Sequence, residues 1–312
     1  MATEKPVEIK RRHHYLPCSY LSGFASKDER DGLIWVADSK EHKTYRQTCE
    51  NVGYKKDYYQ IDVPDTKPDA IEDAFAIIEG IGKQAILKIE KDKAIPQGSA
   101  YSELMSYLAL LFARVPNVRE YWNAQIGELK KLEGKARISQ QTPQEIFDFF
   151  KESDQPFATL KEAEDFRDEI LGDDYIVKYD QTTEIRTVVQ NADIVAGLLA
   201  ERFWTVAYRT DNQSNRFVTC DHPVMLFWNV PIEGNHPPGF GLTNTKVYVP
   251  LSMNTALFGL FEKKDYLNTR LTNHLIKKHN FLTTLHSDRF VFSFEKGFKF
   301  INEKGAELSY ES

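Results

Sequence analysis

The sequence holds few cysteines, and they stand far apart along the chain. Its 312 residues include three, at Cys18, Cys49 and Cys220. Isolated cysteines in odd number give neither the paired short spacings of a zinc site nor a disulfide framework. Such usage is typical of a reducing compartment, so we expect the protein in the cytoplasm.

Several motifs of common enzyme classes are absent as well. There is no Gly-x-x-x-x-Gly-Lys-Ser/Thr loop, no Gly-x-Gly-x-x-Gly after a predicted strand, no Gly-x-Ser-x-Gly elbow and no His-Glu-x-x-His helix. These patterns respectively cradle phosphates, bind dinucleotides, expose a nucleophilic serine and hold zinc. Their absence disfavours nucleotide-driven motors, dinucleotide oxidoreductases, serine hydrolases of the elbow type and the common zinc proteases.

The chain also lacks a positive net charge and a long hydrophobic run. It carries 46 acidic against 40 basic residues, a net charge of −6, so it does not present the overall positive field of a non-specific nucleic-acid binder. A local basic patch stays open. No apolar run approaches the roughly 20 residues that cross a bilayer, and the start of the chain has no hydrophobic signal segment. We therefore expect no membrane partner and no secretion.

Hydrophobic residues make up 41% of the chain, which suffices for a substantial core. Their periodicity divides the chain into a small β-rich cap at 1–65, a helical section at 66–202 and an antiparallel β-rich section with one late helix at 203–312. Helices and strands are thus segregated along the sequence. We predict an α+β fold in which the three sections form one integrated domain.

The helical section is expected to open with two long, largely buried helices. The first follows Pro68, and the second begins at Ser99 as its N-cap. Pro116 lacks an amide donor, so the second helix either kinks there or ends and restarts. Shorter helices are predicted at 143–151, 160–171 and 187–202.

One stretch near the N-terminus combines imidazoles, phenols and bases with hydrophobic side chains. It reads Arg11-Arg12-His13-His14-Tyr15-Leu16-Pro17-Cys18-Ser19-Tyr20-Leu21-Ser22-Gly23-Phe24. A solvated tail would lack the leucines and aromatics, and an ordinary core element would have little use for adjacent histidines. The pattern indicates a polar site on a partly buried segment.

Three motifs in the chain resemble those of the family known as domain of unknown function 4238. Residues 14–24 (His-Tyr-Leu-Pro, then Tyr-Leu and Phe) resemble its opening signature, 114–116 (Arg-Val-Pro) its Arg-x-Pro motif, and 217–224 its Phe-x-x-Ser-Asp-Asn-Pro-Val motif. Cys220 stands where the family usually has Ser, and His222 where it usually has Asn. The resemblance covers nearly the whole chain and implies an architecture and candidate positions, but no activity.

His14, Asp221 and Arg114, one from each motif, are the candidate catalytic residues. His14 would serve as a general base, because imidazole titrates near neutral pH. The alternative is a buried histidine bonded to a carbonyl or carboxylate. Since neighbouring side chains on a strand point to opposite faces, at most one of His13 and His14 is expected to be buried.

The other two candidates also have structural alternatives. Asp221 would orient His14, or it would bond backbone amides in a turn before Pro223. Arg114 would clamp a phosphate or carboxylate, or it would pair with Glu79 between two helices, and we favour the pair.

Tyr15, Tyr20, Lys55 and Lys56 are the candidate substrate-binding residues. Around the two lysines, basic and aromatic side chains alternate as they do on nucleic-acid surfaces. The alternative is an ordinary solvated strand.

A divalent metal is a candidate cofactor. Its candidate ligands are His14, Asp221 and His222, whose imidazoles and carboxylate suit several divalent ions. No local motif fixes a third ligand, so the sequence leaves the metal requirement open.

Two functions from different classes fit these residues. The first is a hydrolase or nuclease, metal-dependent if the ligands assemble, that acts on a phosphodiester in nucleic acid or a nucleotide. The second is a non-catalytic binding or regulatory module with a protein partner, from a mobile-element or phage-defence setting. It would use the tyrosine-rich cap and the loop at 229–244, which is rich in proline and glycine.

The opening stretch is expected to dock against the turn at 220–223 and the Arg114 end of the long helix. The cap is too small to bury its own hydrophobic residues, so it must lie on the other sections. Burying His14, Asp221 and Arg114 separately would cost a few kcal/mol each, whereas a shared cluster offsets that cost. We therefore predict that His14→Ala and Asp221→Ala are coupled in stability by roughly 0.5–3 kcal/mol.

Overall fold

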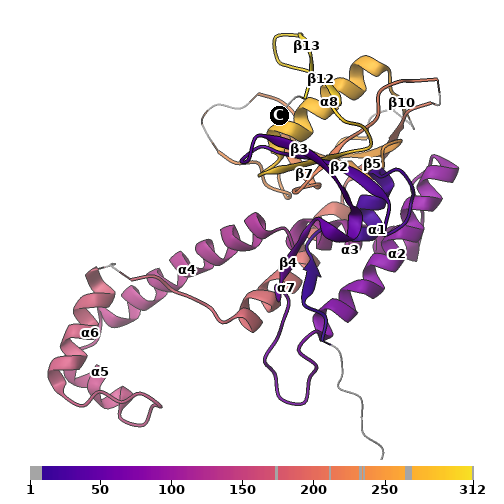
Figure 1. Cartoon of the computed structure of the whole chain (residues 1–312). Coiled ribbons are helices and arrows are strands. Elements are labelled where there is room, and N and C mark those ends of the chain that lie inside the picture. The colour runs from indigo at the N-terminus through magenta and orange to yellow at the C-terminus, as the bar shows by residue number, and fades with distance from the viewer. Residues whose placement is uncertain are drawn as a thin grey trace, which may run out of the picture.

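The computed structural model describes residues 9–172, 175–210, 212–231, 234, 236–263 and 269–310. The two larger sheets and the late helix α8 gather at one end of the molecule, and the central helices lie below them, beside β4 (Figure 1). Short strands come first in the chain, helices follow, and a second set of strands closes it. The predicted α+β class is confirmed.

The N-terminal section consists of short elements. They are β1 (Arg12–His14), α1 (Cys18–Leu21), η1 (Ser22–Phe24), β2 (Leu33–Asp38), β3 (Lys43–Thr48), η2 (Cys49–Asn51) and β4 (Tyr54–Lys56). β1 pairs antiparallel with β4, and β2 and β3 form the antiparallel hairpin expected from their β-favouring residues. Pro17 ends the extended β1 segment and stands at the N-cap of α1.

The central section contains six helices among the described residues. They are α2 (Ala70–Asp92), α3 (Ser99–Ala113), α4 (Pro116–Ile138), α5 (Pro143–Phe150), α6 (Leu160–Gly172) and α7 (Gln181–Ala200). The helix that follows Gly98 takes Gly98 rather than the predicted Ser99 as its N-cap, because Gly98 tolerates a φ of 64°. Pro116 ends one helix and occupies the first turn of the next, where its missing N–H costs nothing.

α3 is the centre of the helical section. It is apolar on most sides and packs against both α2 and α7. The far part of α4, with α5 and α6, instead projects from the body as an arm (Figure 1). The arm has a small core of its own around Ile138, Ile146 and Ala163.

The C-terminal section supplies most of the two larger sheets. Its elements are β5 (Phe203–Tyr208), β6 (Thr219–Cys220), β7 (Met225–Trp228), β8 (Thr245–Pro250), β9 (Thr255–Leu260), β10 (Thr269–Arg270), α8 (Asn273–His286), β11 (Phe290–Ser293), β12 (Lys299–Ile301) and β13 (Glu307–Ser309). The predicted antiparallel sheet is present as β5, β9, β8 and β7, and β10 adds a short parallel edge. The predicted late helix is α8, which begins at Asn273 because the Thr272 side chain caps it.

Two strands of the C-terminal section pair outside the main C-terminal sheet. β6 and β11 join the N-terminal hairpin in a second sheet of order β3-β2-β11-β6, with β11 antiparallel to β2. The first and last parts of the chain therefore share one set of backbone hydrogen bonds.

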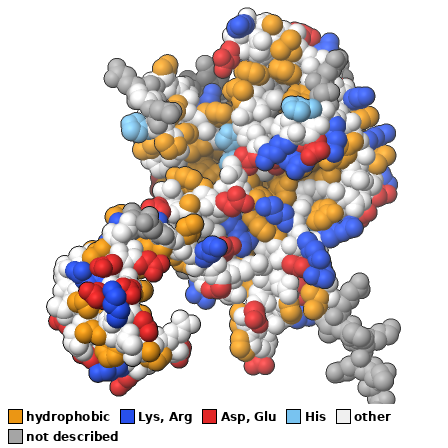
Figure 2. All heavy atoms as spheres, turned by 60° about the vertical axis from the view of Figure 1, so that its left-hand side comes forward, with side chains coloured by type: hydrophobic (Ala, Val, Ile, Leu, Met, Phe, Trp, Pro, Cys, Tyr) orange, Lys and Arg blue, Asp and Glu red, His pale blue; other side chains and the backbone are white. Residues whose placement is uncertain are grey.

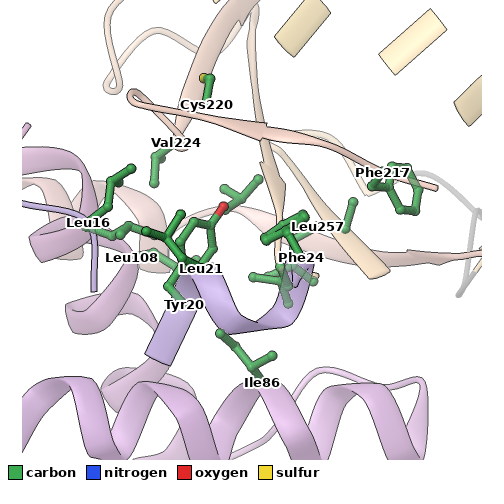
Figure 3. Packing of buried hydrophobic residues seen from close by; sticks show 14 of the residues in the cluster. Leu16, Tyr20, Leu21, Phe24, Ile86, Leu108, Phe217, Cys220, Val224 and Leu257 are labelled. Atoms are coloured by element: carbon green, nitrogen blue, oxygen red, sulfur yellow. The ribbon is translucent and has the colours of Figure 1, made fainter. Parts of the chain in front are cut away.

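The principal core joins the opening stretch to both other sections. Figure 3 shows Tyr20, Leu21 and Phe24 packed between Ile86 of α2 and Leu257 of β9. The Tyr20 hydroxyl also lies 2.7 Å from Thr219 Oγ1 and donates to the carbonyl oxygen of Pro250 at 2.6 Å. The prediction that the opening stretch docks on the helical and sheet sections is confirmed.

Within the described parts of the chain, no helix is both long enough and apolar enough to span a bilayer. The cysteines Cys18, Cys49 and Cys220 are buried and free of disulfides.

Candidate functional site

Both histidines of the opening stretch are buried, which corrects the expectation that only one would be. His13 Nδ1 accepts a hydrogen bond from the backbone N–H of Tyr59 at 2.6 Å, and its Nε2 lies 2.8 Å from the carbonyl oxygen of Lys10. The expectation failed because β1 is covered on both faces. His13 thus supports the fold with both ring nitrogens.

His14 faces a cavity of about 560 Å³ between β1 and α2, which we call the β1–α2 cavity. It is lined by Ile9, Lys10, Arg11, Arg12, His14, Cys18, Arg30, Glu50, Glu72, Ala76 and Glu79. His14 Nε2 lies 3.3 Å from the carbonyl oxygen of Glu50. Burial lowers the pKa of His14 to about 4, with neighbouring arginines adding to the effect, so the ring is neutral near pH 7.

Glu72 is the titratable residue of this cavity that the sequence prediction missed. Burial raises the pKa of its carboxyl to about 7, and the positive charge of Arg114 opposes the rise. Its Oε2 atom is buried and has no hydrogen-bond partner among the described residues. The signal was the seven-residue spacing of Glu72 and Glu79, which places both carboxylates on one face of α2.

The predicted pair between Arg114 and Glu79 is present. Arg114 is 1% exposed, and its Nη2 donates to Glu79 Oε1 at 2.8 Å. Its Nε also donates to the carbonyl oxygen of Tyr15 at 3.1 Å. Glu79 lines the β1–α2 cavity, whereas Arg114 lies behind it. Arg114 therefore positions the wall of the cavity instead of reaching a ligand as the predicted clamp.

Other cations of the cavity are better placed to meet an anion. Neither Arg12 nor Arg30 forms an ion pair with a carboxylate in the described residues. Arg12 Nη1 donates to Asn51 Oδ1 at 2.8 Å, and its guanidinium lies over the Tyr54 ring at 5.3 Å. Arg30 is exposed at the cavity edge. Among the described residues, these two side chains carry positive charge without an ion-pair partner.

Asp221 lies in a second cavity and supports the backbone. Its carboxylate oxygens accept hydrogen bonds from the backbone N–H groups of Asp288, Arg289 and Phe290 at 2.9, 2.8 and 2.9 Å. Burial raises the pKa of Asp221 to about 6, and these bonds oppose the rise. Asp221 thus anchors the start of β11 through amides 67 to 69 positions away, instead of amides in its own turn as the structural alternative expected.

One residue of each motif lines this second cavity, the Tyr15 cavity, of about 520 Å³. Tyr15, Pro116 and Asp221 are the three. His14 and Asp221 share no hydrogen bond and line different cavities. The three motifs do meet, but His14, Asp221 and Arg114 do not form the predicted cluster. The backbone at Tyr15 separates the cavity of His14 from that of Asp221.

All three motifs lie within the part of the chain that a protein-family model matches. A family model described as "Protein of unknown function (DUF4238)" matches residues 12–297. The chain belongs to this family. No curated protein and no solved structure matches the chain.

In this DUF4238 protein the candidate metal ligands are not assembled. The centroid of the His222 ring lies 4.5 Å from that of the His286 ring. His222 does not line the β1–α2 cavity, which His14 faces. Across the described ranges, no group of three or more His, Cys, Asp and Glu side chains is arranged to hold a metal ion.

The four candidate substrate-binding residues of the DUF4238 chain lie in different surroundings. Tyr20 is buried in the core with its hydroxyl bonded on both sides, so it cannot contact a substrate. Tyr15 lines the Tyr15 cavity, as does Lys55, whose Nζ lies 3.7 Å from Glu120. Lys56 is exposed on β4. Of these four residues, Tyr15 and Lys55 thus share the Tyr15 cavity.

Proposed function

We propose that this DUF4238 protein is a hydrolase acting on a phosphodiester in nucleic acid or a nucleotide, with its reaction centre in the β1–α2 cavity. The supporting observation is a half-buried carboxyl, Glu72, with one buried oxygen and a pKa of about 7. Within the described residues, that oxygen has no hydrogen-bond partner, and Arg12 and Arg30 in the same cavity form no ion pair. A cavity of about 560 Å³ has the size of a small-molecule site.

The two arginines would hold the substrate. A phosphodiester carries one negative charge on two non-bridging oxygens, and a guanidinium can donate to both at once. Arg12 is steadied by Asn51 and Tyr54, so less conformational freedom is lost when it binds. Arg30, which is exposed and lines the same cavity, would supply a second guanidinium to the phosphate.

Glu72 would move the proton. As carboxylate it accepts a proton from a water molecule while that oxygen attacks phosphorus, and the bond from phosphorus to the leaving alkoxide breaks. The protonated carboxyl then returns the proton to the alkoxide. A group with a pKa near 7 suits both halves of this cycle, because it is neither too weak a base nor too weak an acid. His14, being neutral, adds hydrogen bonding without repelling the arginines.

The test is a cleavage assay on the purified chain. Labelled single- and double-stranded DNA, RNA and a nucleotide diester are incubated with magnesium, manganese or EDTA. We expect cleavage of at least one substrate, a loss of about 100-fold or more in Glu72→Gln, and a raised KM in Arg30→Gln. The matched controls are Glu103→Gln on α3 and Arg186→Gln on α7, both exposed and outside the cavity.

Two results would contradict the proposal. The first is an absence of cleavage in every condition. The second is full activity in Glu72→Gln, which would remove the carboxyl from the reaction.

We place this activity in the cytoplasm. The supporting observation is that Cys18 and Cys49 are both free, although they lie close enough for each thiol to shift the pKa of the other. Neighbouring thiols of this kind persist where the surroundings keep them reduced.

A further inference from the structure

A third cavity, about 590 Å³ in volume, opens between α3, α4, α7, β7 and the loop before β8. We call it the aromatic cavity. Phe112 lies at its centre, with ring centroids 5.8 Å from Trp122 and 4.8 Å from Phe240, both in edge-to-face contact. Figure 2 shows hydrophobic side chains gathered on the face where the arm meets the body. The arrangement offers flat apolar surfaces to a ring of similar size.

The rim of the cavity leaves apolar side chains in water. Tyr121 is 56% exposed and Ile194 is 62% exposed, and both line the cavity. Large side chains exposed at the edge of an apolar hollow mark binding surfaces, because an occupant would cover them.

The lining contains no charged side chain. Among the described residues that line it, the only side chains with nitrogen donors are Asn117, Asn191, His222 and the Trp122 indole, and the rest are apolar apart from Tyr121. A charged ligand would lose its hydration there without gaining a partner, which costs several kcal/mol. The cavity therefore favours an uncharged occupant.

His222 supplies an unmet hydrogen bond. Its Nε2 is buried without a partner in the described structure, as is Nε2 of the neighbouring His286. Burial lowers the pKa of His222 to about 4, so at neutral pH one ring nitrogen donates and the other accepts. A ligand with a pyridine-type ring nitrogen would accept a hydrogen bond from His222 in the tautomer that carries the proton on Nε2.

We propose that the aromatic cavity binds an uncharged, planar heteroaromatic molecule, which packs against Phe112 and Trp122 and hydrogen-bonds to His222. This goes beyond the proposed hydrolase, since the aromatic cavity and the β1–α2 cavity share no lining residue. Asn117, however, lines both the aromatic cavity and the Tyr15 cavity. The ligand would thus lie beside the meeting point of the three motifs.

The proline- and glycine-rich loop forms one wall. Pro237, Pro238, Gly239 and Phe240 line the cavity, and the Phe240 carbonyl accepts a hydrogen bond from Arg202 Nη2 at 2.6 Å. Part of the loop at 229–244 thus lines this cavity, while residues 232, 233 and 235 of that loop lie outside the described residues. The Arg202 contact holds the wall in position.

The experiment uses quinoline, a neutral bicyclic heteroaromatic, as the probe in isothermal titration calorimetry with the full chain. We expect saturable binding at one site. Quinoline-2-carboxylate, which has the same rings and a negative charge, should bind at least tenfold more weakly. Ile194→Arg should weaken quinoline binding at least tenfold, because it places a charged chain across the entrance.

The matched control is Ile77→Arg. Ile77 is 69% exposed on α2 and does not line the aromatic cavity, so the same substitution should leave quinoline binding unchanged. Ile194 is similarly exposed, so its variant should fold. His222→Phe keeps a ring but removes the nitrogen, and it should weaken quinoline binding about tenfold.

Each opposite result would overturn the proposal. No binding of quinoline up to its solubility limit, equal binding by Ile194→Arg, or equal binding of the carboxylate would each exclude this cavity as a site for neutral heteroaromatics. Equal binding by His222→Phe would overturn the hydrogen bond assigned to His222.

Discussion

Arg114 Nε donates a hydrogen bond to the carbonyl oxygen of Tyr15 at 3.1 Å, joining two motifs that stand 99 positions apart. At this point the chain passes between two cavities. The His14 side chain lies in one of them and the Tyr15 side chain in the other, because successive residues of an extended segment alternate in direction. The family motifs therefore build a partition, and Glu72, with its pKa raised to about 7, lies on the His14 side.

Removal of the Arg114 guanidinium should strongly destabilise the protein. Arg114→Met leaves the Glu79 carboxylate and the Tyr15 carbonyl without their donor, and we expect a loss of about 3–5 kcal/mol in the free energy of unfolding. Urea denaturation measures it. The double variant Arg114→Met/Glu79→Met should recover at least about 1 kcal/mol, because no charge is then left unpaired.

The control for this ion pair is Lys88→Met. Lys88 pairs with Asp92 on the exposed face of α2, where such pairs contribute less than about 1 kcal/mol. Equal losses in Lys88→Met and Arg114→Met would show that burial does not decide the contribution of the Arg114 pair.

Tyr20→Phe should weaken the attachment of the opening stretch to the sheets. It removes a hydroxyl that bonds Thr219 and Pro250 in the core, and we expect a loss of about 1–3 kcal/mol from the unmet partners. Thermal unfolding provides the measurement. Tyr121→Phe, at a largely exposed tyrosine, should stay within about 0.5 kcal/mol of the wild type. If Tyr20→Phe were as stable as the wild type, packing alone would hold the opening stretch on the sheets.

Glu72 should make stability depend on pH between about 4.5 and 7. Its pKa is raised in the folded state from 4.5 to about 7, so the folded protein holds this proton more tightly than the unfolded chain does. The contribution of Glu72 to the free energy of unfolding is fully present below pH 4.5 and is lost as the pH rises through 7. At 1.36 kcal/mol per unit the upper bound is about 3 kcal/mol, and access of solvent to the cavity reduces it to about 1–2 kcal/mol.

Glu72→Gln tests this dependence directly. The variant should match the wild type near pH 4.5 and be more stable at pH 8 by the amount that the wild type has lost. Glu103→Gln, at an exposed carboxyl of α3, should follow the wild-type curve. Parallel curves for wild type and Glu72→Gln across pH 4–8 would show that Glu72 is not perturbed by burial.

His14→Ala and Asp221→Ala should now be additive in stability. The coupling of roughly 0.5–3 kcal/mol expected from a shared cluster required contact, and the two residues line different cavities. We expect the double variant to equal the sum of the single losses within about 0.5 kcal/mol. A coupling above about 1 kcal/mol would show that a change in one cavity alters the stability of the other through the segment at Tyr15.

The sequence by itself determined the class of the fold and most of its local elements. Helical and alternating periodicities are local properties of the chain, so α2, the β2–β3 hairpin and the main C-terminal strands followed from them. The pair of Arg114 and Glu79 was also predictable, since each charge on a largely buried helix needs a partner.

Tertiary structure decided which strands pair and where each motif side chain points. β6 and β11 read locally like any other strands of the C-terminal section, and only packing placed β11 beside β2. Burial, which is set by neighbours far apart in the sequence, raised the pKa of Glu72 and tied Asp221 to the backbone of β11. Proton affinity depends on this environment, so the sequence pointed to the motifs, while only the fold showed which carboxyl has a raised pKa.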